Sequence, residues 1–172
     1  MLKFASLVAV VSALVLGTVA RTEDPKKEPT GPKPPTFKAP KEWKELERDK
    51  FGIATARFGI GEGEKQVVVT LVTARGTLAD NVNRWRGQVG LDSLDDEAAL
   101  KTLKPIKVDG LPGHILDVTG PEKEGKITQR IVGIVVPVGE ATWFIRMGGP
   151  AAVVGEQKSA FDEFVKSIRF AK

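Results

Sequence analysis

The sequence predicts one α/β domain of the α+β type, an α/β/α sandwich in which a mostly antiparallel sheet of about six strands carries two main helices. Three observations predict it. Short β-branched runs alternate along the chain with amphipathic helical segments. The turns between runs are of hairpin length, which favours antiparallel pairing. The 172 residues, 41% of them apolar, suit a single domain and exclude a wholly disordered chain.

The first twenty residues have the layout of a secretory signal. Lys3 and the amino terminus are positive, an apolar run follows from Ala5 to Leu16, and small residues precede a possible cleavage site after Ala20. We therefore predict a signal peptide over 1–20 and an exported protein, periplasmic or secreted. The alternative is an uncleaved anchor in the inner membrane over 4–20, since such a run is just long enough to span a bilayer. The sequence alone leaves cleavage open.

Residues 21–41 are predicted to be a flexible linker rich in proline and lysine. Six of the 11 prolines lie here, and six basic residues outnumber three acidic ones. The globular domain predicted over 42–172 then has 19 basic and 19 acidic residues and is neutral. A nucleic-acid-binding domain normally has a basic excess, so the sequence argues against such a partner. Whether the basic linker contacts lipid or cell-wall polymer stays open.

The first half of the domain reads as three strands and a helix. Short strands are expected at 43–48 and 51–58, followed by a glycine-rich turn over 59–64 and a strand over 66–73 that is apolar on both faces. The spacing then predicts a helix over 77–89, with Thr77 as its cap and Asp80 completing a capping box. Its buried stripe comprises Leu78, Val82, Trp85 and Val89.

The second half reads as a short helix, four strands and a final helix. The short helix is expected over 93–103, capped by Ser93 and ended by Pro105. Strands over 106–108 and 114–118 flank a turn at 110–113, and further strands are expected over 127–136 and 141–147. The last helix is predicted to begin at Pro150. Its apolar face comprises Val154, Phe161, Phe164, Val165 and Ile168.

Three segments carry a family resemblance: TFKAPKEW at 36–43, TLADNVNRWRGQV at 77–89 and FDEFVKSIRF at 161–170. The chain resembles exported bacterial PsbP-like domains over about 36–170, and within them an uncharacterised envelope-protein subset. That resemblance implies an α/β/α sandwich and a non-enzymatic binding or assembly role. Its motifs are structural, so it implies no cofactor. Many relatives have a lipid-attachment cysteine after the signal, and this chain has none.

Most catalytic chemistries lack their residues in this chain. There is no cysteine, and His114 is the only histidine. Asp117 would lie on the opposite face of a regular strand from His114, so no catalytic pair is expected. The glycine-rich segment 59–65 departs from a phosphate loop, because Glu64 stands where glycine is required. The acidic run at 95–97 suits the first turn of a helix. We therefore predict no catalytic residues, no metal site and no cofactor.

The helix over 77–89 is the best candidate for a binding surface. Asn81, Arg84 and Gln88 follow one polar stripe, whose amide and guanidinium groups could hold a carboxylate, a sugar or a partner loop. The competing interpretation is a solvated helix face above the buried Trp85.

Arg130 and Arg146 are also candidates, because each lies in an otherwise apolar strand. A buried guanidinium needs a partner. That partner is either a structural carboxylate, with Asp117 the plausible one, or a ligand.

Together these features predict an exported, non-enzymatic binding or assembly module of the cell envelope. Its partner would be an unknown envelope protein or a small ligand, with membrane contact only through an uncleaved N-terminal segment. One alternative is a structural envelope protein that self-associates through an apolar patch. Another is a hydrolase that uses carboxylates, which requires acidic groups converging in a pocket. The sequence decides neither the ligand's identity nor the oligomeric state.

Overall fold

The computed structural model describes residues 32–47 and 54–171. The chain divides into two compact units, and the described residues belong to the second, Pro32–Lys172. The predicted signal peptide or anchor and most of the predicted linker lie outside the described residues. Within the described part, no helix is long and apolar enough to cross a membrane.

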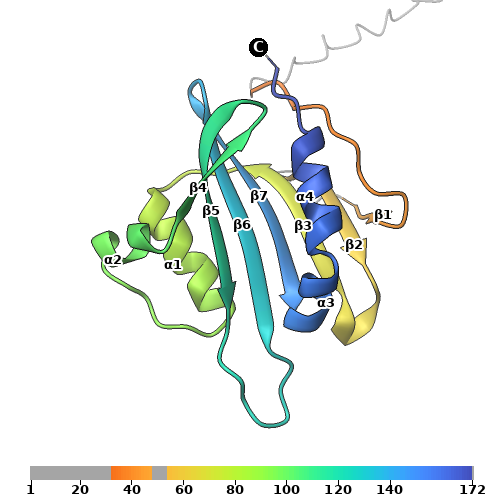
Figure 1. Cartoon of the computed structure of the whole chain (residues 1–172), viewed down its shortest axis with the longest axis vertical. Coiled ribbons are helices and arrows are strands. Elements are labelled where there is room, and N and C mark those ends of the chain that lie inside the picture. The colour runs from red at the N-terminus through yellow and green to blue at the C-terminus, as the bar shows by residue number, and fades with distance from the viewer. Residues whose placement is uncertain (1–31, 48–53, 172) are drawn as a thin grey trace, which may run out of the picture. The chain divides into compact units, whose positions relative to one another are not determined.

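A seven-stranded sheet forms the centre of the domain, with the strand order β1-β2-β3-β7-β6-β5-β4 (Figure 1). Every neighbouring pair is antiparallel. The predicted fold class is therefore confirmed, with one strand more than the expected six. The strands are β1 (Lys44–Glu45), β2 (Ala54–Ile60), β3 (Val67–Thr73), β4 (Lys104–Val108), β5 (Leu111–Thr119), β6 (Gln129–Val138) and β7 (Ala141–Pro150).

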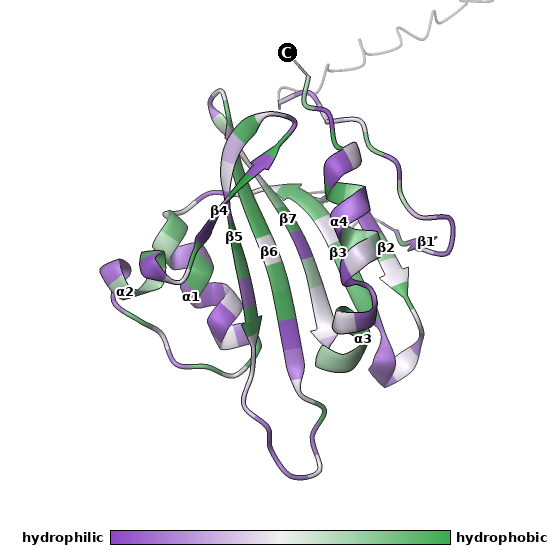
Figure 2. Ribbon diagram, in the orientation of Figure 1, coloured by the Kyte–Doolittle hydropathy of each residue, from purple (hydrophilic) through white to green (hydrophobic). Residues whose placement is uncertain are grey.

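Helices cover both faces of this sheet. On one face lie α1 (Leu78–Gln88) and α2 (Asp96–Lys101), and on the other lie α3 (Ala151–Glu156) and α4 (Lys158–Ser167). Each face has its own hydrophobic core. The central strand β6 is buried on both sides over residues 131–136, and Figure 2 shows its mostly hydrophobic composition.

The core under α1 centres on Trp85. Its ring lies directly on Gly133 of β6, where a Cβ atom would collide with it, and it packs edge-on against Phe144 of β7. The expected capping box is confirmed, because the Thr77 hydroxyl accepts from the Asp80 amide while the Asp80 carboxylate accepts from the Thr77 amide. This cap fixes where α1 begins, and the tryptophan fixes its height above the sheet.

The core under α4 is built from aromatic side chains. Trp43, Phe58 and Phe164 have ring centroids 5.3–5.9 Å apart, and Phe37 joins them at 5.4 Å from Phe164. Thr36 also forms a β-bridge with Arg169. Packing against the core thus already begins with Phe37, inside the segment predicted to be linker.

Several predicted turns are in fact strand. β7 continues through Gly148 and Gly149 to Pro150, because these residues still pair with β6. Pro150 is therefore the N-cap of α3 and not its first helical residue. The predicted turn at 110–113 is wrong as well. The chain turns one residue earlier, at Asp109 and Gly110, which both have positive φ.

The predicted helices are shorter than expected. Asp95, not Ser93, caps α2 by accepting from the Ala98 amide. The helix ends at Lys101, and β4 already begins at Lys104, so Pro105 lies in this strand. The predicted final helix is two, separated at Gln157. In the first half, β1 covers only two residues of the strand expected at 43–48, and β2 extends to Ile60.

Candidate functional site

A row of side chains crosses the α1 face of the sheet, one residue per strand. The pairing register aligns Arg57 of β2 with Thr70 of β3, Thr70 with Arg146 of β7, and Arg146 with Gly133 of β6. Because their strand neighbours fill the opposite core, these four residues face α1. The ring of Trp85 from α1 packs on Gly133. The row therefore begins under α1 at β6 and continues across β7 and β3 to β2.

Arg146 is the central group of this row. Its guanidinium lies against the backbone of Gly148, where a Cβ atom would be only 2.5 Å from Nη2. Its buried Nε has no hydrogen-bond partner among the described residues. Burial lowers the pKa of the Arg146 guanidinium below its ordinary value, and the charge of nearby Arg84 lowers it further. The environment therefore disfavours this cation, and nothing described here compensates it.

Arg84 is held beside Arg146 by a buried amide. Asn81 is fully buried; its Nδ2 donates to the Thr77 carbonyl at 2.7 Å, and its Oδ1 accepts a hydrogen bond from Arg84. Asn81 therefore orients Arg84. The helical spacing predicted Asn81 on an exposed polar stripe, and this prediction is wrong because the side chain is buried. The first turn of α1, fixed by its capping box, thus determines where this guanidinium lies.

No carboxylate forms an ion pair with these cations in the part of the chain that the structure describes. The ion pairs found there do not include Arg57, Arg84 or Arg146. Arg57 donates from Nη1 to a backbone carbonyl, that of Glu47, at 3.0 Å. The pKa of the Asp80 carboxyl is lowered mainly by its hydrogen bonds with Thr77, and the charge of Arg84 makes the smallest contribution. We call Arg57, Thr70, Arg84 and Arg146 the arginine face.

The other two predicted candidates lie elsewhere. Arg130 is on the α3 and α4 face, where Nε and Nη2 donate to the two Asp117 carboxylate oxygens at 2.8 and 2.7 Å. The expected structural pairing with Asp117 is confirmed, and this bond raises the pKa of Arg130. Gln88 is exposed at the end of α1 and lines a separate shallow pocket with Pro121. Of the five predicted candidates, the structure therefore brings together three, Asn81, Arg84 and Arg146.

Two members of the arginine face were missed from the sequence. Arg57 and Thr70 are polar residues in the middle of largely apolar strands, and polar residues at alternate positions are ordinary for a half-buried sheet. The signal that singles them out is the register across β2, β3 and β7, which places them beside Arg146. That register is a property of the tertiary structure, whereas the sequence shows only which strand residues are polar.

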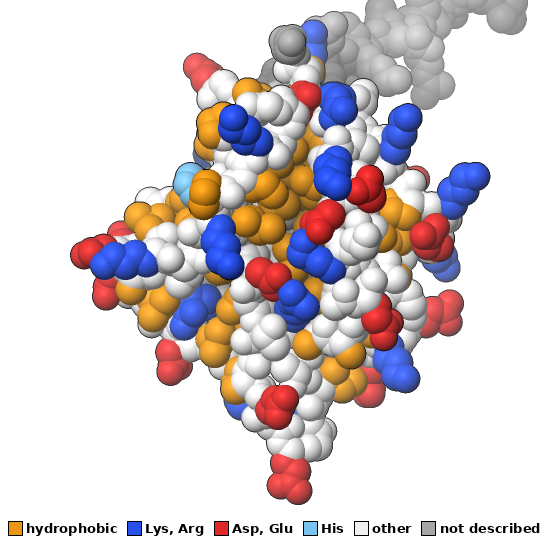
Figure 3. Space-filling view, viewed as in Figure 1, with side chains coloured by type: hydrophobic (Ala, Val, Ile, Leu, Met, Phe, Trp, Pro, Cys, Tyr) orange, Lys and Arg blue, Asp and Glu red, His pale blue; other side chains and the backbone are white. Residues whose placement is uncertain are grey.

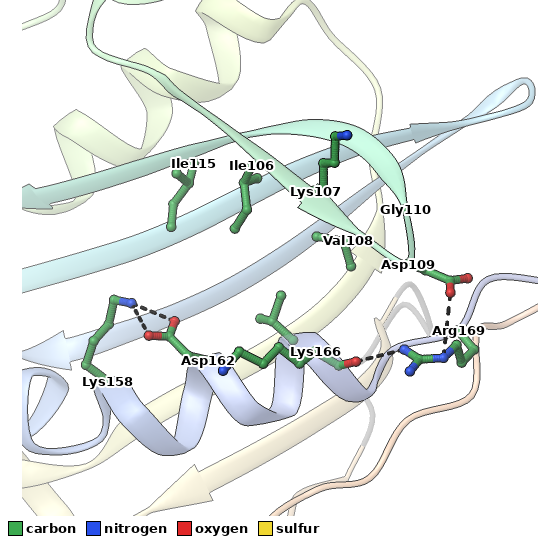
Figure 4. A pocket seen from close by; sticks show the side chains of 11 residues that line it. Ile106, Lys107, Val108, Asp109, Gly110, Ile115, Lys158, Asp162, Lys166 and Arg169 are labelled. Carbon is green, nitrogen blue, oxygen red and sulfur yellow. Dashed lines mark hydrogen bonds and ion pairs between the residues drawn. The ribbon is translucent and has the colours of Figure 1, made fainter.

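The α3 and α4 face carries a groove whose charges differ from those of the arginine face. This groove of about 690 Å³ separates the β4–β5 hairpin from α4, with Ile106 and Ile115 on its apolar side (Figures 3 and 4). Its cations from the α4 side are paired: Lys158 with Asp162 at 2.6 Å and Arg169 with Asp109 at 3.6 Å. Because most of the charged side chains that line it are paired, this groove makes a weaker demand for a charged ligand than the arginine face does.

His114 and Asp117 do not form a catalytic pair. They lie on opposite faces of β5, since Asp117 reaches Arg130 on the α3 side while alternate residues face α1. Within residues 32–47 and 54–171, no cluster of three histidine, aspartate or glutamate side chains could hold a metal ion.

No family model and no curated protein matches this chain. Among solved structures it is similar to LpqN, described as involved in cell envelope biogenesis of Mycobacterium tuberculosis, at 12% identity and a TM-score of 0.54. That match covers 86% of this chain and 88% of LpqN. The likeness to LpqN supports the fold alone, because the identity is low.

Two further structures were found at lower TM-scores. CyanoP, the cyanobacterial PsbP of Synechocystis sp., matches at 14% identity and a TM-score of 0.48, over 78% of this chain and 85% of that chain. A Bacteroides thetaiotaomicron structure matches at 12% identity and a TM-score of 0.47, over 79% of this chain and 44% of that chain. This chain therefore spans less than half the length of the Bacteroides protein. Because no family model matches, membership of the PsbP-like group stays a prediction.

Proposed function

We propose that this chain is an exported, non-enzymatic binding module of the cell envelope, which holds an anionic group of its ligand between Arg84 and Arg146. One observation carries the proposal: the half-buried Arg146 guanidinium has an unpartnered Nε and a second arginine as its charged neighbour. An anion at this point would satisfy the donor and neutralise the repulsion between the two cations.

The energetic argument rests on the cost of the unliganded state. A buried donor without a partner typically costs ~1–3 kcal/mol, and two guanidinium groups side by side repel one another. Arg130, on the other face, shows how this fold compensates an arginine when the role is structural, because Asp117 binds it with two hydrogen bonds. Arg146 lacks that compensation, which supports a ligand role.

The envelope assignment rests on the N-terminal sequence and on one structural neighbour. Residues 1–20 have the layout of an export signal, followed by a proline-rich segment. LpqN, which shares the fold, is described as involved in cell envelope biogenesis. Both observations favour a domain that works outside the cytoplasmic membrane.

A binding role is favoured over hydrolysis by what the acidic residues do. Asp95 caps α2, and Glu97 pairs with Lys101 at 2.6 Å. Neither converges with a second acidic group on the arginine face. The described part of that face offers donors and positive charge, which suits recognition of an anion and supplies no general base.

The proposal can be tested by titrating the purified protein with sodium acetate and sodium phosphate at constant ionic strength. Nitrogen-15 NMR reports the arginine Nε–H signals individually, and we expect those of Arg146 and Arg84 to move saturably. Arg146→Met should weaken the affinity by tenfold or more. Lys101→Gln, on the exposed surface of α2, provides a matched loss of one positive charge and should leave it unchanged.

Two results would count against this function. The first is a set of Nε–H signals that move linearly and equally in every arginine, which indicates screening and not a site. The second is an equal loss in the Arg146→Met and Lys101→Gln proteins. If the site binds anions, crosslinking in the native envelope with the same three proteins then identifies the partner that Arg146 holds.

A further inference from the structure

The arginine face is longer than one anion requires. Arg57 and Arg146 lie on the same side of the sheet in one register row, two strands apart. With neighbouring strands ~4.8 Å apart, their Cα atoms are separated by about 10 Å. Thr70 lies between them, and its hydroxyl can donate to an anion or accept from a neighbouring group.

The two ends of the row have similar chemistry. Arg57 and Arg146 are both half-buried residues. The Arg146 guanidinium lies against Gly148, and that of Arg57 reaches an exposed backbone carbonyl at the edge of the sheet. Arg57 uses Nη1 for the Glu47 carbonyl, a neutral acceptor that leaves its charge uncompensated. Neither has an ion pair within the described residues. The sheet therefore anchors two arginines at the two ends of one register row, with Arg84 joining the Arg146 end.

Resting on the proposed function, we propose that the ligand carries two anionic groups at opposite ends of an extended molecule, one bound by Arg146 with Arg84 and the other by Arg57. A ligand that spans both ends makes its second contact within the same complex, which multiplies the affinity when the span matches. Carboxylates and phosphates share this chemistry. The ligand class is therefore a polyanion of extended shape, and not an isolated small anion.

Rigid spacing makes a specific demand on ligand length. A linker that is too short reaches one end only, and one that is too long loses effective concentration. We therefore expect the affinity to pass through a maximum along a series of α,ω-dicarboxylates from malonate to sebacate. The maximum should be at least tenfold tighter than acetate at the same ionic strength. A parallel series of α,ω-bisphosphonates distinguishes a phosphate-bearing ligand from a carboxylate-bearing one.

Variants separate this inference from the proposed function. Arg57→Gln keeps a donor for the Glu47 carbonyl, so the fold is retained, but it removes the second charge. We expect this variant to keep the acetate-induced shifts of the Arg146 and Arg84 Nε–H signals and to lose the maximum with chain length. Arg146→Met should lose both. Lys101→Gln should keep both, which shows that net charge is not responsible.

A dicarboxylate series with no maximum, or a maximum that persists in Arg57→Gln, would overturn the two-point ligand. In that case acetate binding that still depends on Arg146 would leave the proposed function intact. If the Arg146 Nε–H signal of the wild type does not respond saturably to acetate, or if Arg146→Met binds acetate unchanged, the proposed function itself is refuted. Circular dichroism of each variant confirms that a lost affinity reflects the removed charge and not unfolding.

Discussion

Replacing Arg146 by methionine is expected to stabilise the domain while abolishing anion binding. The unpartnered Nε costs about 1–3 kcal/mol in typical cases, and the half-buried position of the residue places the expected gain near the lower end, at about 1 kcal/mol. The methionine chain can still cover Gly148, so no cavity is opened. For a domain of this size, about 1 kcal/mol raises the Tm by roughly 3–4 °C.

Arg130→Met is the matched control for this prediction. It makes the same chemical change on the neighbouring strand, but it removes two charge-assisted hydrogen bonds and leaves Asp117 unpaired. Because the pair is partly exposed, with side-chain exposures of 26% and 38%, we expect a destabilisation of about 1–2 kcal/mol. The two substitutions should therefore shift the free energy of unfolding in opposite directions.

The assay is urea unfolding monitored by tryptophan fluorescence, with thermal unfolding as a second measure. It is run without multivalent anions, because a bound anion would stabilise the wild type and mask the difference. The reasoning is refuted if Arg146→Met lowers the free energy of unfolding by as much as Arg130→Met does. That result would mean that Arg146 is satisfied in the folded protein and needs no ligand.

Three further predictions concern the packing and capping of the fold. Gly133→Ala should destabilise the fold by about 1–3 kcal/mol, since the new methyl group collides with Trp85; Gly87→Ala, with open space around it, should be neutral or stabilising by up to ~1 kcal/mol, as measured by urea unfolding. Hydrogen bonds from the helix cap hold the pKa of the Asp80 carboxyl below its ordinary value, so its stabilising effect is present above ~pH 4 and is lost as the pH falls; the Tm difference between wild type and Asp80→Asn should shrink between pH 5 and pH 3. Phe37→Ala should cost about 2 kcal/mol, because this residue packs on Phe164; no loss of stability would place the segment outside the folded domain.

Much of the fold follows from local sequence. The apolar stripe and capping box of α1 follow from side-chain spacing, because the hydrogen bonds between Thr77 and Asp80 close within one helical turn. The β-branched runs likewise mark the buried strands. Boundaries were less predictable: Gly148, Gly149 and Pro150 have the composition of a turn, yet they lie in β7 because β6 pairs with them.

The candidate site divides in the same way. The sequence marks Arg130 and Arg146 as equivalent, each a guanidinium in an apolar strand that needs a partner. Which one has a carboxylate depends on which residue lies across the neighbouring strand, and Asp117 lies diagonally across from Arg130 on β5. Arg146 lies beside Thr70 and Gly133, neither of which carries a charge.

By itself, the sequence determined the chemistry available to this protein: the absence of cysteine, the single histidine, the amphipathic helices and the arginines within apolar strands. Only the tertiary structure decided which of these groups meet. Residues on one strand alternate between two faces, and the register of seven strands assigns Arg57 and Arg146 to one row and Arg130 to the other side. Register is set by long-range pairing and packing, which local spacing does not encode.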